Sequence, residues 1–316
     1  MDAEMIRGQA EKAEGCLLGQ LAGDALGGLV EFQAPEEIRR RYPGGVRDLA
    51  DGGTWNTLAG QPTDDSEMAL ALARLLAARG YYDAAAARAA YGRWLDSGPF
   101  DVGLTVSAGL RGRPNAASQA NGALMRISPL GIFGVRRDPA RVAEWARQDA
   151  AITHPHPVCV QANALFALAV ARAVREPVAP AELYRAIRLS AAGAETTLRE
   201  AIEAAEKDPP PDYVSQQGWV LIAFRNALWQ LLHAANLEDG VVDTVMRGGD
   251  TDTNAAICGA LLGAVHGAGA VPARWRKALR ACRPEAGRPG VKRPRPEEYW
   301  PVDAEELAVQ LLGEAI

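Results

Sequence analysis

Two distant segments of this chain carry glycine at every fourth position. Residues four apart lie on one face of an α-helix, and glycine weakens a helix, so a glycine face requires a packing reason. Close approach of neighbouring backbones supplies that reason. The alternative is a dimer motif of membrane helices, which Asp24 and the short apolar length disfavour. The pattern predicts two central, closely packed helices that contain Gly15, Gly19, Gly23 and Gly27 and, far downstream, Gly259, Gly263 and Gly267.

The rest of the chain shows helical periodicity and almost no strand-like alternation. Gly80 is placed to end one helix, and Asp138 and Asp303 are placed to begin two others. The sequence therefore predicts an all-α fold in a single domain over residues 1–316, with an extended Pro- and Arg-rich surface loop at 283–301. The other expected helices cover 67–79, 139–150, 158–174, 180–191, 194–206 and 216–235, with one beginning at Pro272 and a last one ending at Leu312.

Charge and cysteine usage limit the class of protein. The chain has 34 Lys and Arg against 39 Asp and Glu, a net charge of −5, which favours neither nucleic acid nor a membrane as a general partner. The charged N-terminus contains no apolar signal region, and the four cysteines form no CxxC pair. We expect a cytoplasmic monomer without a zinc or redox motif, and the abundance of Arg and Ala is typical of GC-rich bacterial coding.

Two acidic clusters each precede an apolar helical segment. The first is Thr63-Asp64-Asp65-Ser66, and the second is GGDTDTN at residues 248–254. Either cluster alone would be interpreted as an ordinary helix N-cap. One cap needs only one residue, however, and hard divalent cations take carboxylate and hydroxyl oxygens as ligands. Two such clusters, each beside a glycine-striped helix, favour one two-metal site built from both ends of the sequence.

Other positions offer candidate chemistry on weaker patterns. Glu31, in GLVEF, is either a general base with a raised pKa or an ordinary surface glutamate. His154 and His156, in ITHPHP, are either transition-metal ligands or, as we favour, a source of one imidazole that donates to a substrate phosphate or hydroxyl. The Asn121-Gly122 turn can present backbone N–H groups to an anion.

Together these motifs resemble the ADP-ribosylglycohydrolase family, which includes glycohydrolases that activate dinitrogenase reductase and hydrolases of ADP-ribosylarginine and ADP-ribosylserine. The resemblance implies a compact orthogonal helical bundle with a central dinuclear centre of two Mg²⁺ or Mn²⁺ ions. The matching segments are GCLLGQLAGDALGGLVEF (15–32), PTDDSEMALAL (62–72), PFDVG (99–103), NGALMRISPLG (121–131), ITHPHP (152–157), QGWVLIAFRNALW (217–229) and RGGDTDTNAAICGALLGAVHG (247–267), in the family's order.

The resemblance also implies roles for individual residues. Glu31 matches a glutamate that acts as a base or mobile ligand, and Asp101, which pattern alone would dismiss, matches an acid near the ribose. His154 matches a histidine in the substrate cleft. The loop that holds the distal ribose and pyrophosphate corresponds to Asn121, Gly122 and Ala123, and the metal ligands correspond to Thr63, Asp64, Asp65, Asp250, Asp252 and Thr253.

The expected function is metal-dependent hydrolysis of the glycosidic bond between ADP-ribose and an acceptor, with ADP-ribosylated arginine on a protein as the first choice. The alternatives are O-linked, nucleic-acid or small-molecule ADP-ribose conjugates, a non-catalytic ADP-ribose-binding homologue, and a two-metal phosphohydrolase that acts on the pyrophosphate. Ala120 stands where the family commonly has glycine or serine, and Ser66 where it frequently has threonine. The difference at Ala120 leaves the substrate preference open.

Overall fold

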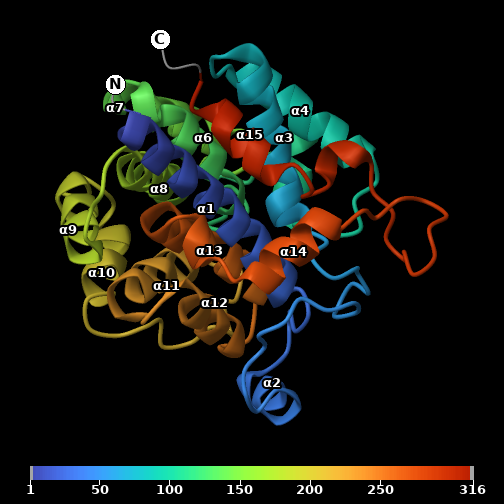
Figure 1. Ribbon diagram of the computed structural model, residues 1–316. Helices are drawn as coiled ribbons and strands as arrows, with labels where there is room; N and C mark the ends of the chain where they lie inside the picture. The colour runs from blue at the N-terminus through green and yellow to red at the C-terminus, as the bar shows by residue number, and fades with distance from the viewer. Residues whose placement is uncertain (1–2, 314–316) are drawn as a thin grey trace.

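The computed structural model of the protein describes residues 3–313. These residues form helices joined by loops, with two isolated β-bridges and no longer strand in the described range, so the predicted all-α class is confirmed (Figure 1). The helices are α1 (Ala3–Gly27), α2 (Pro35–Arg41), α3 (Asp64–Arg79), α4 (Ala84–Asp96), α5 (Leu104–Leu110), α6 (Ser128–Phe133), α7 (Pro139–Ala151), α8 (Pro157–Arg175), α9 (Pro180–Ser190), α10 (Thr196–Ala204), α11 (Val220–His233), α12 (Leu237–Met246), α13 (Thr251–His266), α14 (Ala273–Ala281) and α15 (Ala304–Leu311), with short 3₁₀ turns at Leu124–Arg126, Gly134–Arg136, Ala268–Ala270 and Glu297–Tyr299.

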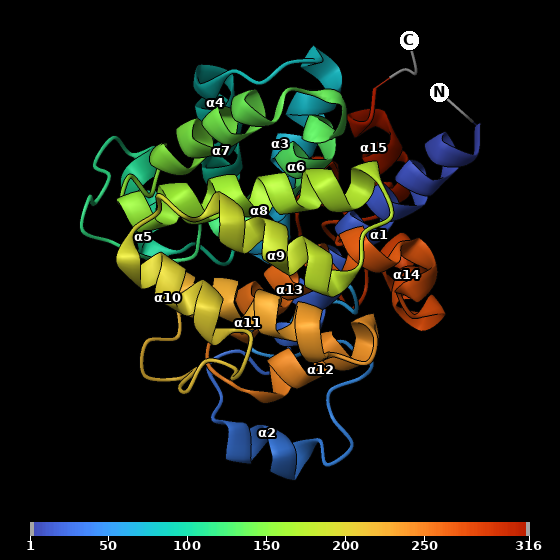
Figure 2. The same cartoon turned by 90° about the vertical axis from the view of Figure 1, so that its left-hand side faces the viewer.

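The two glycine-striped helices, α1 and α13, pack directly against each other (Figures 1 and 2). A Cβ atom added at Gly15 would lie 2.5 Å from the carbonyl oxygen of Gly263, and one added at Gly27 would overlap the backbone of Asp252. Because the middle of α1, at Gly15, meets the end of α13, and the end of α1, at Gly27, meets its start, the two helices run antiparallel. The glycine stripes therefore bring two backbones into contact and fix their register.

The remaining helices enclose this pair. Helices α8, α11 and α12 pack on α13, α15 packs on α1, and α6 packs on both α3 and α8, while α2 projects from the main body in both views (Figures 1 and 2). By length and composition alone α8 could cross a membrane, but 72% of its apolar window is buried inside the protein. One cluster of buried side chains extends from Ala13 to Leu312, so the two ends of the chain contribute to the same core.

Most helix ends follow the sequence signals. Gly80 ends α3 with a left-handed φ of 71°, and the Asp138 carboxylate accepts the backbone N–H of Arg141 in the first turn of α7. Asp303 departs from expectation: it precedes α15 but makes no capping hydrogen bond. Its two carboxylate oxygens instead accept from the guanidinium of Arg74 at 2.7 and 2.8 Å, because an arginine of α3 reaches it across the tertiary fold.

The 283–301 segment is extended, as expected, and part of it projects from the body (Figure 1). The interpretation as a surface loop is wrong at Arg295, which is only 5% exposed. Its guanidinium donates to both carboxylate oxygens of Glu67 at 2.7 and 2.8 Å, and the Glu67 carboxylate also accepts from the indole of Trp94. This buried ion pair fastens the C-terminal loop to the first turn of α3.

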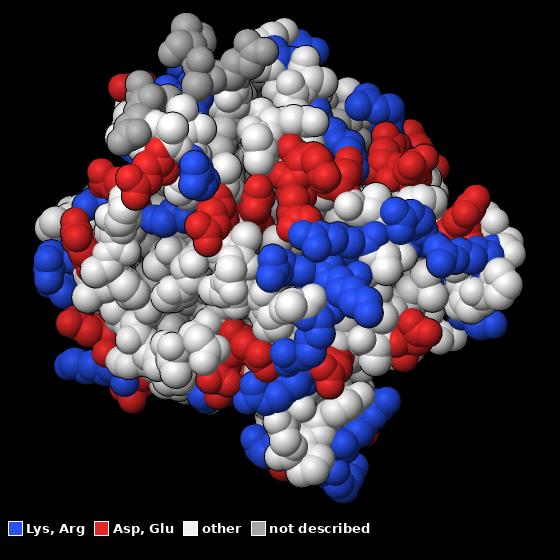
Figure 3. All heavy atoms as spheres, in the orientation of Figure 1, with Lys and Arg blue, Asp and Glu red and all other residues white. Residues whose placement is uncertain are grey.

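Charged side chains of both signs cover the face seen in Figure 3, with a band of Lys and Arg across α14. Two of these cations are paired with protein acids: Arg274 with Glu238, and Arg280 with Glu305. The band is therefore partly neutralised within the protein.

The contact between α1 and α13 predicts an asymmetric response to alanine substitution along α1. Gly19→Ala should lower the free energy of unfolding by about 2–3 kcal/mol, because the new methyl group would overlap the Gly259 backbone. Gly8→Ala, in the same helix with nothing within 4 Å of the added carbon, should raise it by up to about 1 kcal/mol through helix propensity. Urea denaturation of both variants tests this, and equal effects would refute the packing role of the stripe.

Candidate functional site

The N-terminus of α3 is capped by a residue of α1. Thr63 precedes α3 but makes no side-chain capping bond. Instead, the carboxylate of Asp24 accepts the backbone N–H groups of Thr63 and Ser66, each at 3.0 Å, and the Thr63 hydroxyl at 2.9 Å. Asp24 is fully buried, and it fixes the 63–66 turn against α1. The carboxylates of Asp64 and Asp65 therefore do not have to cap α3.

The N-terminus of α13 is held from outside in a similar way. Gly248 and Gly249 each adopt a left-handed φ of 75°, which glycine tolerates without strain. Asp250 makes no capping hydrogen bond; its Oδ2 atom accepts from the side-chain amide of Asn121 at 2.7 Å. The hydroxyl of Thr251 donates to the carbonyl of Gly27 at 2.7 Å. The ordinary-cap interpretation therefore fails for both acidic clusters.

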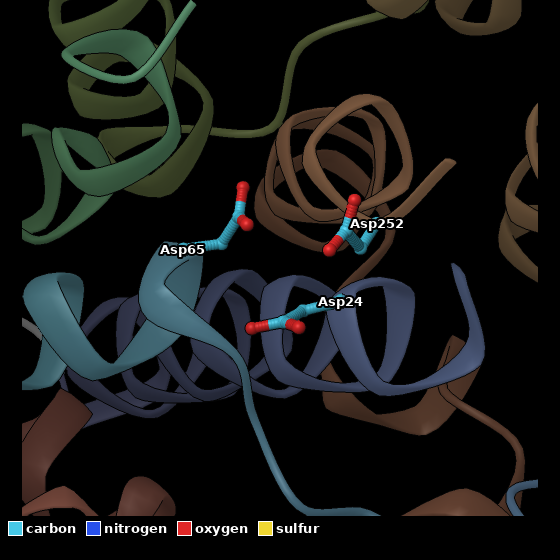
Figure 4. Close-up of side chains that lie close together, drawn as sticks. All are labelled: Asp24, Asp65 and Asp252. Carbon is cyan, nitrogen blue, oxygen red and sulfur yellow. The ribbon is translucent and has the colours of Figure 1, made fainter. Parts of the chain in front are cut away.

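The two clusters meet in the folded protein. Asp24, Asp65 and Asp252, from α1, α3 and α13, surround one common space (Figure 4). One carboxylate oxygen from each lies within 4.8 Å of the others, and Glu31, Asp101 and Asp252 form a second group by the same measure. Asp252 belongs to both groups and lies at the centre of the cluster.

The cluster has the properties of a cation site. Asp65 and Asp252 are each 1% exposed, and the Oδ1 atom of Asp65 and the Oδ2 atom of Asp252 have no hydrogen-bond partner. Burial raises the pKa of both carboxyls well above the usual range, and neighbouring acids raise these pKa values further. Buried carboxylates without protein donors need a proton or a cation. The residues present thus fit oxygen-ligated divalent ions.

Glu31 and Asp101 stand at the edge of the cluster with perturbed acidities. Burial, and then the charges of Asp101 and Asp250, raise the pKa of Glu31 to about 8. The indole N–H of Trp55 donates to Glu31 Oε2 at 2.6 Å and holds the carboxyl in place. Burial likewise raises the pKa of Asp101 to about 6, against the effect of a hydrogen bond with Asp64. Both groups can therefore exchange protons near neutral pH.

A cavity of about 380 Å³ opens beside these carboxyls. One wall combines two loops, because the N–H of Asn121 donates to the carbonyl of Gly218 at 2.9 Å. Phe32 and Leu104 also line the cavity, although they are 54% and 90% exposed. The residues anticipated from sequence that line this cavity are Glu31, Asp64, Asp65, Asp101, Asn121, Gly122, His154, Asp250, Asp252 and Thr253.

Two anticipated residues lie behind the wall. Thr63 is turned toward Asp24 and Asp65, to which its hydroxyl is hydrogen bonded. Ala123 is fully buried and is not part of the cavity lining. Only the backbone N–H of Ala123 can donate to an anion bound at this turn.

The two histidines of ITHPHP have different partners. His156 precedes α8, and its Nδ1 atom accepts the backbone N–H of Val158 at 3.2 Å. His154 is fully buried and faces the cavity. Across residues 3–313, the groups of side chains close enough to share a metal ion contain only acids. The arrangement therefore does not favour a shared transition-metal site for this pair.

Sequence reasoning missed several residues that contribute to the site. Asp24 carried a signal, since it is the only charged residue in the apolar run 15–30. The cavity-lining residues Gln217 and Gly218 begin the 217–229 segment, in which the resemblance implies no role for a single residue. Trp55 had no signal, because nothing in the local sequence indicates that its indole reaches Glu31.

Comparisons with known proteins all point to one family. The family model described as ADP-ribosylglycohydrolase matches residues 5–310. The ADP-ribosyl-[dinitrogen reductase] glycohydrolase of Rhodospirillum rubrum is 32% identical over 85% of this chain and 90% of its own. The ADP-ribosylarginine hydrolase Tri1 of Pseudomonas putida is 28% identical over 84% and 73%. A solved structure of an ADP-ribosylglycohydrolase-related protein complex superposes with a TM-score of 0.81 at 26% identity, covering 98% of this chain and 100% of that one.

The raised pKa values predict an unusual pH dependence for the protein in EDTA. A carboxyl whose pKa is raised on folding contributes stability that is complete below its unfolded pKa, about 4. That stability is lost as the pH rises through about 6 for Asp101 and about 8 for Glu31. We expect the melting temperature in EDTA to fall between pH 5 and pH 8, roughly the window of these shifts, and Mg²⁺ to restore it at the upper end.

Thermal unfolding with and without Mg²⁺ measures this effect. Asp252→Asn removes one charge from the cluster and should reduce both the pH dependence and the response to Mg²⁺. The matched control is Glu37→Gln, at an exposed position of α2, which should leave both unchanged. A melting temperature in EDTA that is constant over this pH range would contradict the electrostatic account.

Proposed function

The chain belongs to the ADP-ribosylglycohydrolase family, and on that premise we propose that this hydrolase of ADP-ribose glycosidic bonds depends on divalent cations and acts on ADP-ribosylated arginine. The observation that carries the cation dependence is the meeting of the 63–65 and 250–253 turns around Asp252. At that point two buried carboxylate oxygens, one each on Asp65 and Asp252, have no protein donor. A protein that hydrolysed this bond with its own acids alone would have no need for so many unpaired buried charges.

The two turns together would hold the ions. Their ligand residues would be Thr63, Asp64, Asp65, Asp250, Asp252 and Thr253. Asp24 has a supporting part in this proposal, because both of its oxygens already accept protein N–H or O–H groups. It orients the ligands of the α3 turn, as partners behind a metal site commonly do. When bound, two such ions orient hydroxyl groups and lower the pKa of water.

Cleavage of the bond at the anomeric carbon develops oxocarbenium-like positive charge on the ribose. In our proposal, the water oxygen bonds to the anomeric carbon as the bond to the guanidine nitrogen breaks. Glu31 takes the proton from this water, a role that contributes typically about 10²–10⁴-fold to the rate. The departing guanidine, neutral as it leaves, takes up a proton from the solvent. The Oε2 atom of Glu31 is held by Trp55, so the other carboxyl oxygen can face the cavity. Asp101, on the same rim, faces the ribose, and its negative charge favours the developing cation.

The rest of the cavity would hold the ADP-ribose. The amide N–H groups of Asn121 and Leu124 already bond to carbonyls within the protein, which leaves those of Gly122 and Ala123 as the candidates for an anion in this turn. His154 faces the same space. At about 380 Å³ the cavity suits part of an extended ligand, and the exposed Phe32 and Leu104 at its rim offer apolar contact to the remainder.

Arginine is the proposed acceptor for two reasons. The names of the relatives from Rhodospirillum rubrum and Pseudomonas putida describe removal of ADP-ribose from dinitrogen reductase and from arginine. In addition, a rim that carries Glu31 and Asp101 favours a cationic guanidinium over a neutral acceptor.

The proposed role of Glu31 predicts a separation of binding from turnover. Glu31→Gln retains the shape of the side chain and can still accept the Trp55 N–H, but it cannot take up a proton. We expect ADP-ribose affinity within about twofold of the parent and kcat lower by about 10²–10⁴-fold. Calorimetry with ADP-ribose and single-turnover kinetics measure the two quantities, with Glu37→Gln as the control. An unchanged rate would remove Glu31 from the mechanism.

The substrate proposal predicts the outcome of a panel of defined conjugates. ADP-ribosylarginine peptide should be cleaved faster than serine-linked, base-linked and O-acetyl conjugates, with ADP-ribose as the product. Chromatography separates ADP-ribose from AMP, and release of AMP would indicate pyrophosphate cleavage instead. Preference for another conjugate would refute the arginine assignment alone.

The cation dependence is tested with the same conjugates. Asp252→Ala should abolish hydrolysis, and excess EDTA should do the same to the parent protein, while the helical content stays largely intact. Full activity under either condition would refute the requirement for divalent ions. Binding of ADP-ribose without turnover of any conjugate would point to a non-catalytic homologue.

A further inference from the structure

His154, which lies in the cavity wall, carries a polar atom without a partner. The side chain is fully buried, it lines the cavity, and its Nε2 atom has no hydrogen-bond partner in the protein. A buried polar atom without a partner is uncommon and calls for an explanation. Whether Nε2 carries a proton decides what it can bind, because a neutral imidazole has one donor nitrogen and one acceptor nitrogen.

The other ring nitrogen is connected to a buried ion pair. Arg126 and Asp149 are both fully buried and bonded, Nε to Oδ1, at 3.0 Å. Tyr91 donates its hydroxyl to the second oxygen of Asp149 at 2.9 Å, and its ring lies against the guanidinium. The Nη1 atom of Arg126 then donates to the hydroxyl oxygen of Thr153 at 2.9 Å. The direction of this last bond is fixed, since arginine has donors only.

The bond from Arg126 determines which group donates in the next bond, between the Thr153 hydroxyl and the imidazole of His154. The hydroxyl oxygen accepts from Arg126 and lies 2.8 Å from Nδ1 of His154. If Nδ1 carried the proton, the hydroxyl would accept two bonds, and its own proton would be buried without an acceptor. That arrangement is costly in a fully buried position. The hydroxyl therefore donates to Nδ1, which must be unprotonated.

We infer that Asp149, Arg126 and Thr153 fix His154 as the neutral tautomer with its proton on Nε2, so that the imidazole expected in the substrate cleft meets an oxygen of the ligand as a donor. The ligand part of this inference rests on the proposed function, and the tautomer part does not. Thr153 and Arg126 are positioning residues, because they act on the ligand only through the imidazole.

Two further observations support the inference. Burial, and then the charge of Arg126, lower the pKa of His154 to about 3, so the ring stays neutral at physiological pH. The same Nη1 atom also donates to the carbonyl of Gly122 at 3.3 Å, and a Cβ on Gly122 would lie 3.4 Å from Nε2. One guanidinium thus holds both the Gly122 turn and the imidazole beside it, so the candidate amide donors and Nε2 are held close to one another.

The tautomer can be measured directly in the unmodified protein. The chain has four histidines, so long-range ¹H–¹⁵N correlation spectra of ¹⁵N-histidine-labelled protein can be assigned by single substitutions. We expect His154 to show a protonated Nε2 and an unprotonated Nδ1 at neutral pH, and to remain so on acidification to about pH 5, well above its lowered pKa. A protonated Nδ1 in the unliganded protein would overturn the inference.

The link to the ligand is tested with ADP-ribose in the presence of Mg²⁺. Thr153→Val removes the hydroxyl while keeping the shape of the side chain, and Thr153→Ser restores it. We expect the valine variant to lose the single tautomer and to bind ADP-ribose about tenfold more weakly, and the serine variant to recover both. The His154 Nε2–H resonance of the parent should shift on saturation. Equal affinity of the parent and valine variants would overturn the ligand part.

These results separate the inference from the proposed function. If ADP-ribose does not bind the parent protein, the proposed function fails, while the spectra of the free protein still decide the tautomer. If Thr153→Val does not fold, the parent spectra and the resonance shift with ADP-ribose decide both parts without it.

Discussion

The direct contact between the backbones of α1 and α13 is the constraint on which the rest of the structure depends. Because glycine removes every side chain along this line, the helices meet at a separation that a single methyl group would prevent. Their register then brings Gly27 against Asp252 and leaves Asp24 one turn away. From that position Asp24 caps α3 and fixes Asp65. Three helix ends are thus held at one point by backbone packing and by the capping bonds of Asp24.

The protein contains two buried groups of acids, and only one of them is fully paired with protein side chains. Asp149 is neutralised within the protein, since Arg126 and Tyr91 occupy its oxygens. Asp65 and Asp252 have no such partner for one oxygen each, and burial disfavours their charged forms. Buried charge is tolerated when it is paired. The contrast within one molecule supports the proposal that a divalent cation completes the second group, because such an ion has the required charge and ligand preference.

Much of the fold could be anticipated because its signals are local. Helical periodicity, the left-handed Gly80 and the Asp138 cap are set by residues within one or two turns of one another. The signals failed where a distant residue competed. Asp303 has the position of a cap, but Arg74 takes its carboxylate, and Arg295 has the surroundings of a solvated loop but is buried against Glu67. Nothing in the sequence next to Asp303 or Arg295 indicates its distant partner.

For the site, the sequence by itself determined the kinds of atoms available: two turns rich in carboxylates and hydroxyls, each at a helix start, and two glycine faces able to pack closely. Only the tertiary structure decided that the two glycine faces meet each other, that Asp24 belongs with Asp65 and Asp252, and that Trp55 holds Glu31. It also decided that a chain of buried hydrogen bonds directs the imidazole of His154. The physical reason is that local sequence sets backbone conformation, whereas burial, charge pairing and the direction of a hydrogen bond depend on which distant segments share the same space.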